Sequence, residues 1–231
     1  EVAIFTRNPY YHAVDTEGNQ LPYIDEIRHD LFQDNETFNL WIAQGRIDLQ
    51  GRHVRIGNYP FYVENEGTGD YKVVQWKRLD VETIWPNQTT RNAPLAELFQ
   101  NPVFREAINI AIDRDTINEI SFAGFGEPMQ AGPGRGAAIS SETLLTKWTE
   151  FDPERAEALL DSIGLDLRDA DGYRLRPDGE RLSVTITNPT QFDLEPLELV
   201  AADWEAIGIE VTLENIERSL YLDRMSANEV E

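Results

Sequence analysis

The sequence of 231 residues contains no cysteine and only three histidines. A chain without cysteine forms no disulfide, carries no thiolate nucleophile and offers no sulfur ligand to a metal. His12, His29 and His53 all lie in the first quarter of the chain and lack the spacing of metal ligands. The sequence therefore predicts no metal site and no cofactor.

Long apolar runs are also missing. No stretch approaches the roughly 18 residues that a membrane-spanning helix needs, and the chain starts without the charged segment and apolar block of a signal peptide. The missing initiator methionine and the abrupt end at Glu231 suggest a segment of a longer protein. The absence of targeting signals is therefore uninformative about location.

Positive charge is scarce. The chain has 42 acidic and 20 basic residues, a net charge of −22, and we expect no nucleic-acid partner because that affinity comes from cations that face phosphates. Lys72, Lys77 and Lys147 are the only lysines. An acidic, lysine-poor surface is typical of proteins that work in high salt, where screening removes self-repulsion. A GC-rich genome that favours arginine is the equal alternative.

Helical patterns are well marked. Residues 101–120 repeat apolar side chains at three- and four-residue steps behind a cap, Asn101, and predict one amphipathic helix that the following glycines end. Asp34 or Asn35 begins a predicted helix that runs through Gln44. Further helices are predicted at 56–66, from Asp152 to Gly164, and from Arg218.

Alternation of apolar and polar residues predicts strands at 27–32, 47–49, 71–76 and 79–85. Near the end of the chain, residues 182–187, 195–207 and 209–213 have the patterns of a strand, a helix and a second strand. Strand–helix–strand units of this length pair their strands in parallel. The sequence therefore predicts an α/β fold.

Two Asp-Gly turns, at 171–172 and 178–179, predict a hairpin. A calcium loop is the rival interpretation, but one register lacks the acidic ligand at loop position 12 and arginines interrupt the other. The glycine-rich segment 124–134 is not followed by the Gly-Lys-Ser/Thr of a phosphate-binding loop and is interpreted as a connector.

Several phrases of the sequence resemble, in order, those of the family 5 extracellular solute-binding proteins, the dipeptide- and oligopeptide-binding receptors of ABC importers. His12 departs from the family, which usually has an aromatic residue there. The phrases cover nearly the whole chain: Arg-Asn-Pro-Tyr-Tyr (7–11) with Leu-Pro-Tyr-Ile-Asp (21–25), Gly45 with Ile-Asp (47–48), Phe-Arg-Glu-Ala (104–107) with Ala-Ile-Asp-Arg (111–114), Phe-Asp-Pro (151–153) with Leu-Leu (159–160), and Trp204 with Ile-Gly-Ile (207–209).

This resemblance implies a periplasmic-binding-protein-like fold of the two-lobe, class II type, of which the chain is a part. We expect residues 1–88 to be a strand-rich part of the first lobe and residues 89–231 to be the second lobe, incomplete at its C-terminus. The family is monomeric and lies outside the cytoplasm, in the periplasm or as a cell-surface lipoprotein. Its members capture a ligand by hinge closure and deliver it to ABC permease subunits.

Candidate ligand-binding residues follow from the rule that ligands sit beyond the carboxyl ends of strands in open parallel sheets. It selects Trp85 and Asn87 after one predicted strand, and Asn188 and Gln191 after another. Trp85 stacks on a ligand or packs between lobes, and the amides contact a ligand or lie on the loop surface. The carboxylate that holds a peptide's α-amine in the family is expected beyond Glu231.

Catalysis is not expected. A nucleophilic triad needs a His beside Ser or Cys and an acid, and close carboxylates such as Asp113 and Asp115 do not face each other on a helix. We therefore expect a binding protein for peptides. Five tryptophans keep an oligosaccharide as the alternative ligand, because sugar-binding members use aromatic platforms and amides, and a nickel complex is a weaker alternative.

The high-salt hypothesis predicts that the free energy of unfolding rises with salt, because screening weakens repulsion among the acidic side chains. Urea midpoints measured in low salt and in multi-molar NaCl test it, with an upward shift expected. An unchanged or lower midpoint in high salt would favour the genome-composition alternative.

Overall fold

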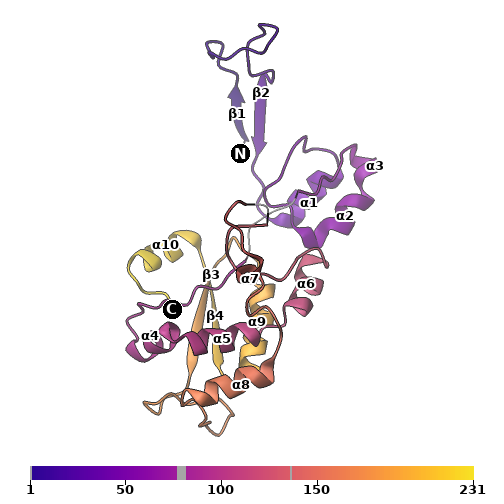
Figure 1. Cartoon of the computed structure of the whole chain (residues 1–231). Coiled ribbons are helices and arrows are strands. Elements are labelled where there is room, and N and C mark those ends of the chain that lie inside the picture. Colours follow the sequence, from indigo (N-terminus) through magenta and orange to yellow (C-terminus); the bar gives the residue numbers. More distant parts are fainter. Residues whose placement is uncertain (1, 77–81, 136) are drawn as a thin grey trace. The chain divides into compact units, whose positions relative to one another are not determined.

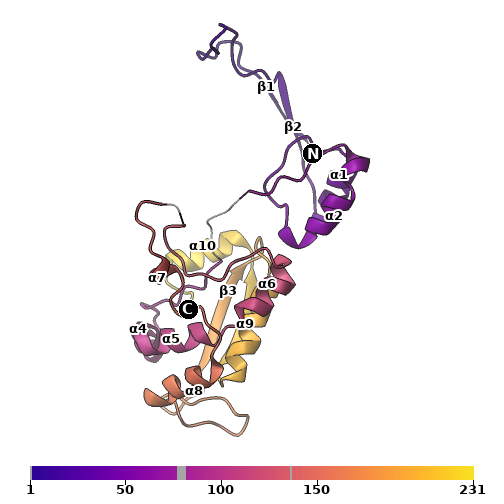
Figure 2. The same cartoon turned by 45° about the vertical axis from the view of Figure 1, so that its right-hand side comes forward.

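The computed structural model describes residues 2–76, 82–135 and 137–231. The chain divides into two compact units, Glu1–Val74 and Gln75–Glu231, called unit 1 and unit 2 below. Figures 1 and 2 show their elements from two directions. The assignment of residues 1–88 and 89–231 to two lobes stays a prediction. No helix in the described ranges is long and apolar enough to cross a membrane.

Unit 1 combines a hairpin with a small helical cluster. Strands β1 (Val2–Thr6) and β2 (Glu26–Asp30) pair antiparallel, which confirms the strand predicted near 27–32. Helix α1 (Asn35–Ala43) begins at Asp34, whose carboxylate accepts the backbone N–H of Thr37 at 2.7 Å, as the sequence predicted. The other helices are η1 (Ile56–Asn58), α2 (Tyr59–Glu64) and α3 (Glu66–Gly69).

Three of the strands predicted in the first half of the chain are not strands where the structure describes them. Residues 47–49 and 71–76 are irregular, so these two predictions are wrong. Of the strand predicted at 79–85, residues 79–81 lie outside the described residues and 82–85 are irregular. Alternation marks a segment that can form a strand, but the strand exists only where a neighbour completes its hydrogen-bond ladder. No described segment pairs with these residues.

Unit 2 is an α/β unit around two parallel strands. Strand β3 (Ser183–Pro189), helix α9 (Glu195–Ala206) and strand β4 (Glu210–Ile216) form the predicted strand–helix–strand unit, in register from Ser183 opposite Glu210 to Pro189 opposite Ile216. Helix α9 lies against β4 (Figures 1 and 2). The remaining helices are α4 (Ala93–Gln100), α5 (Pro102–Ile110), α6 (Arg114–Phe122), α7 (Glu142–Leu145), α8 (Pro153–Ser162) and α10 (Arg218–Ser226).

The single helix predicted at 101–120 is wrong in one respect, because the structure divides it into α5 and α6. The cap at Asn101 is confirmed. The break comes at Asp113, whose carboxylate accepts the backbone N–H of Thr116 at 3.0 Å and its hydroxyl at 2.8 Å. These bonds, the backbone N–H bond first, lower the pKa of the Asp113 carboxyl. The side chain of Asp113 therefore starts a new helix instead of extending the old one.

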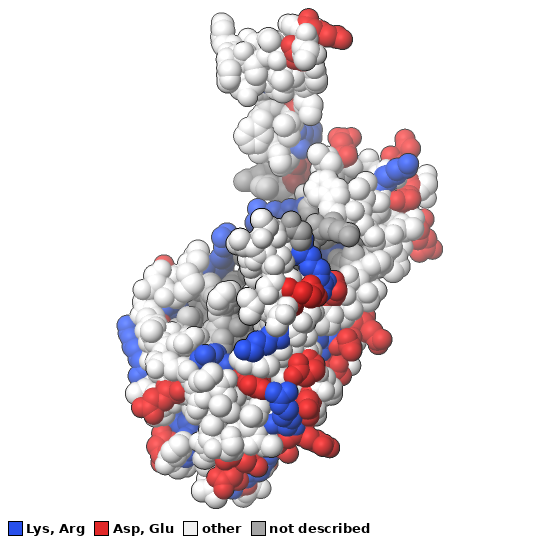
Figure 3. All heavy atoms as spheres, viewed as in Figure 1, with Lys and Arg blue, Asp and Glu red and all other residues white. Residues whose placement is uncertain are grey.

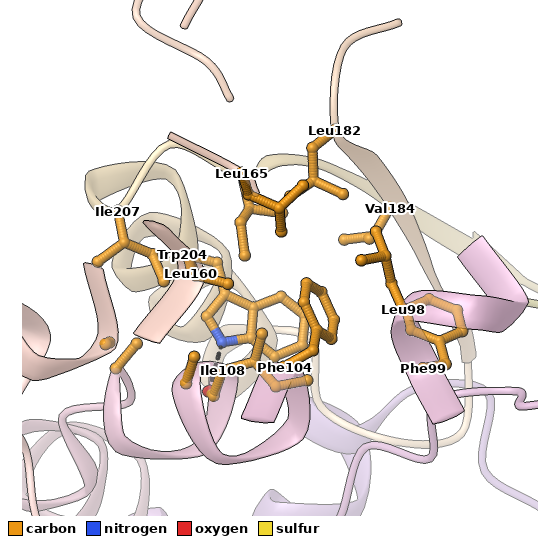
Figure 4. Close-up of a cluster of buried hydrophobic side chains, with 14 of the residues drawn as sticks. Leu98, Phe99, Phe104, Ile108, Leu160, Leu165, Leu182, Val184, Trp204 and Ile207 are labelled. Atoms are coloured by element: carbon orange, nitrogen blue, oxygen red, sulfur yellow. Dashed lines mark hydrogen bonds between the residues drawn. The ribbon is translucent and has the colours of Figure 1, made fainter. Parts of the chain in front are cut away.

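The core of unit 2 lies between the strands and helices α4, α5, α8 and α9. Figure 4 shows the indole of Trp204, from α9, among the buried side chains of α5, α8 and β3. Its ring N–H donates to the carbonyl of Ile108 at 2.9 Å. Trp204 therefore contributes apolar area and a satisfied polar atom at once, which is what a buried tryptophan requires.

The predicted hairpin between α8 and β3 is confirmed. Its chains bridge at Arg168 opposite Arg174 and at Leu175 opposite Arg181, and its two turns place Gly172 and Gly179 at positive φ. Arg181 donates to the carboxylates of Asp169, Asp171 and Glu210. A guanidinium thus occupies the acidic cluster that the calcium interpretation would have used.

Arg174, on this hairpin, is the most deeply buried charged side chain among the described residues, at 1% exposure. Its Nε donates to the carbonyl of Ile207 at 2.7 Å, and its Nη1 donates to the carbonyl of Leu165 and to the carboxylate of Asp161. Its backbone N–H donates to the carbonyl of Gly208 at 2.7 Å. One residue thus satisfies acceptors at the ends of both α8 and α9.

We expect Arg174→Met to lower the free energy of unfolding by about 3 kcal/mol or more, because it leaves buried carbonyls without donors. Urea denaturation measures the change. Arg91→Met is the matched control: its side chain is 68% exposed, and a surface ion pair contributes at most about 1 kcal/mol. Equal midpoints for the two variants would contradict the structural role of Arg174.

Candidate functional site

A hollow of about 720 Å³ lies in unit 2 beside β3. Its walls come from residues 83–88, from helices α4 and α5, from residues 184–189 of β3, and from α10 and the residues after it. Ligand pockets in proteins typically have volumes of about 300–1,000 Å³. The hollow is therefore of the size of a ligand site, and its lining decides what it can hold.

The hollow is lined by apolar side chains and by several amides. Phe99, Phe104 and Val184, which Figure 4 draws in one buried cluster, line it together with Ile108 and Ile186.

Asn188 lines the hollow one residue before the end of β3, whereas the amide of Asn87 bonds to Asn228 and Val230. Asn188 thus lies near the carboxyl end of a parallel strand, as the strand-end rule for ligand sites requires, whereas residues 82–85, before Asn87, are irregular.

Trp85 lines the hollow while its side chain stays 76% exposed. An exposed indole beside a concave surface offers a flat apolar face and one N–H donor. The arrangement can stack on a planar or sugar-like group. Trp85 therefore leaves most of its surface free for a ligand.

Asn87 also lines the hollow, but its amide is already engaged. Its Nδ2 donates to the side-chain oxygen of Asn228 at 2.8 Å and to the carbonyl of Val230 at 2.7 Å. Its Oδ1 accepts the backbone N–H of Thr89 at 3.0 Å. Asn87 therefore fixes the segment that carries Trp85 against the residues after α10.

Asn188 is 5% exposed and lines the hollow from β3. Its Nδ2 donates to the side-chain oxygen of Asn215, its register partner on β4, at 3.2 Å, and to the carbonyl of Phe192 at 3.3 Å. Gln191 is exposed on the loop after β3, outside the residues that line the hollow. The structure thus brings together three of the four sequence candidates.

The contribution of α10 to the lining of the hollow was not predicted from the sequence. Tyr221 and Met225 line the hollow from this helix, and Asn228 lines it just beyond. Tyr221 and Met225 are four residues apart, so they lie on the same side of the helix. The sequence indicates this shared side but not which part of the molecule it contacts.

The lining can bind a ligand through apolar contacts and through hydrogen bonds of its amides. Glu231 is the one charged residue among the described lining residues, and its carboxylate accepts the backbone N–H of Thr185 at 2.8 Å. The described residues contain no cluster of three or more His, Asp or Glu side chains that could hold a metal ion. On the face of unit 2 seen in Figure 3, acidic and basic side chains are interspersed.

Ligands of open α/β sheets bind beyond the carboxyl ends of the parallel strands, and Asn188 lies near such an end. The chain belongs to the bacterial extracellular solute-binding proteins, family 5, whose profile, described as the "Middle" part of that family, matches residues 1–231. This confirms the resemblance seen in the sequence.

Solved structures share the fold, and curated relatives are similar in sequence. An oligopeptide-binding protein OppA is 38% identical, with a TM-score of 0.64, over 100% of this chain and 37% of its own. MelB of Agrobacterium fabrum C58, solved in complex with stachyose, is 22% identical with a TM-score of 0.75 over 96% of this chain and 35% of its own. The periplasmic alpha-galactoside-binding protein of Rhizobium meliloti is 23% identical over 92% of this chain and 33% of its own.

These likenesses confirm the predicted periplasmic-binding-protein-like fold. The chain spans about a third of the length of the relatives it matches. The activity, ligand and partners of the whole protein are therefore matters for a proposal.

Proposed function

We propose that the protein is the solute-binding component of an ABC importer, which captures di- or oligopeptides outside the membrane and delivers them to the permease subunits by hinge closure. It is a binding protein and not an enzyme. Residues 89–231 form most of its second lobe and residues 1–88 part of its first. Membership in the family supports the receptor role.

The observation that favours a peptide is the 38% identity to an oligopeptide-binding protein over the full length of the chain. An oligosaccharide is the second candidate. Trp85, exposed at the edge of the hollow, favours it, because an indole face suits a sugar ring as well as a peptide side chain. The alpha-galactoside-binding relative and the stachyose complex favour it too, at 23% and 22% identity.

The four candidate residues have different roles in this proposal. Trp85 meets the ligand directly, because most of its surface is free. Asn87 and Asn188 act through position: the first holds the segment of Trp85, and the second ties the ends of β3 and β4 together. Gln191, exposed on the following loop, reaches a ligand only beyond the hollow.

The proposal predicts that Trp85→Ala weakens ligand binding by roughly 3- to 10-fold, since a stacked aromatic ring contributes on the order of 1 kcal/mol. Calorimetric titration of the protein, as its host produces it, with mixed oligopeptides and separately with stachyose gives the affinities. Heat released on titration with peptides but not with stachyose supports a peptide ligand. The reverse result would favour an oligosaccharide ligand instead.

Trp76→Ala is the matched control, because Trp76 belongs to the same unit, is 77% exposed and lies outside the lining of the hollow. It should bind the ligand as the unmodified protein does. Equal losses in both variants, or no loss in Trp85→Ala, would remove Trp85 from the ligand site.

A further inference from the structure

Residues 85–91 and the residues that follow α10 are tied together by side-chain amides within unit 2. The side-chain oxygen of Asn228 accepts the Nδ2–H of Asn87 at 2.8 Å, across 141 positions of the sequence. The Nδ2 of Asn228 donates in turn to the carbonyl of Thr89 at 2.7 Å. One side chain thus joins the segment that carries Trp85 to the end of α10.

Asn228 also closes α10. Its backbone has a φ of 56°, and the N–H of Glu229 donates to the carbonyl of Arg224 at 2.8 Å, which is the pattern of a left-handed helix end. Glycine takes this conformation at no steric cost, and asparagine is the usual alternative. A glycine would therefore close the helix equally well. What asparagine adds at this position is the side chain that bonds to Asn87 and Thr89.

The constraint on Asn87 passes directly to Trp85 through Pro86. A proline ring fixes its own φ at about −65° and restricts the preceding residue to extended conformations. On the other side of Asn87, the carbonyl of Gln88 accepts from the side chain of Gln100, on α4, at 2.7 Å. Few backbone torsions between the held amide and the indole are therefore free to change.

Packing alone does little to orient Trp85, because its side chain is 76% exposed. A side chain that moves freely must be ordered when it binds, which weakens binding, whereas a ring already held in its bound orientation avoids that cost. We infer that Asn228 is a positioning residue for Trp85: its side chain holds Asn87 and so keeps the indole directed toward the ligand. The inference rests on the proposed function, which takes Trp85 as a ligand contact.

Fluorine NMR of the whole protein labelled with 5-fluorotryptophan tests the positioning without any ligand. The signal of Trp85 is the one that is absent from Trp85→Phe. Asn228→Gly keeps the helix end and removes both side-chain bonds, so in this variant the signal should move toward its position in the urea-unfolded protein. Ser226→Ala is the matched control, because it removes a hydrogen bond internal to α10, from the Ser226 hydroxyl to the carbonyl of Leu222 at 2.8 Å. It should leave the signal unchanged.

A double-mutant cycle then tests whether the positioning serves binding. Calorimetric titration with the oligopeptides or stachyose, whichever the unmodified protein binds, gives the affinities of Asn228→Gly, Trp85→Ala and the double variant. We expect Asn228→Gly to weaken binding by about 2- to 5-fold on its own and by less than about 1.5-fold where Trp85 is already alanine, because residues that act through one another are not additive. Ser226→Ala should bind as the unmodified protein does.

Three results would overturn the inference, and each identifies a different fault. An unmoved Trp85 signal in Asn228→Gly would mean that the indole is oriented without this side chain, whatever the affinities. A moved signal with equal losses in both backgrounds would give Asn228 a structural role that does not pass through Trp85. A moved signal with full affinity in Trp85→Ala would leave the positioning in place and remove the ligand contact on which the proposed function relies.

Discussion

The buried guanidinium of Arg174 is the interaction on which the architecture of unit 2 depends. It joins the end of α8, through Asp161 and Leu165, to the end of α9, through Ile207. Gly208, at φ +90°, makes the turn into β4, and a Cβ there would approach the side chains of Arg168 and Arg174 too closely. The start of β4 is therefore fixed by a cation that could not be replaced without leaving several acceptors unpaired.

Arg174 and Asn188 lie at opposite ends of strands β3 and β4. Leu182, just before β3, donates its N–H to the carbonyl of Arg174, while Asn188 and Asn215 pair near the carboxyl ends of β3 and β4. The parallel register carries the fixed spacing from one end to the other. The position of Asn188 thus depends on the packing around Arg174, which contains none of the candidate ligand-binding residues, as when a rigid scaffold positions recognition groups.

Local signals in the sequence were sufficient for the elements that local interactions determine. The caps at Asp34 and Asn101, the turns at Gly172 and Gly179, and the strand–helix–strand unit are all present as predicted. The resemblance to the family predicted the fold as a whole. The sequence did not reveal that Asp113 would start a second helix, because a carboxylate inside an apolar repeat can be either a surface residue or a cap.

Non-local features were harder to predict. The strands expected at 47–49 and 71–76 lack partners in the described chain, and a strand cannot form without one. Asn188 lines the hollow near the end of a parallel strand, as the strand-end rule predicts, whereas Trp85 and Asn87 line it although residues 82–85 are irregular. The places of Gln191 and of the α10 residues depend on how a loop and a helix turn back.

The proposed peptide ligand is tested by native mass spectrometry of the protein purified from its host without stripping the ligand. A peptide ligand predicts added masses that are released as short peptides. A mass built from hexose units, or no added mass until an oligosaccharide is supplied, would contradict it.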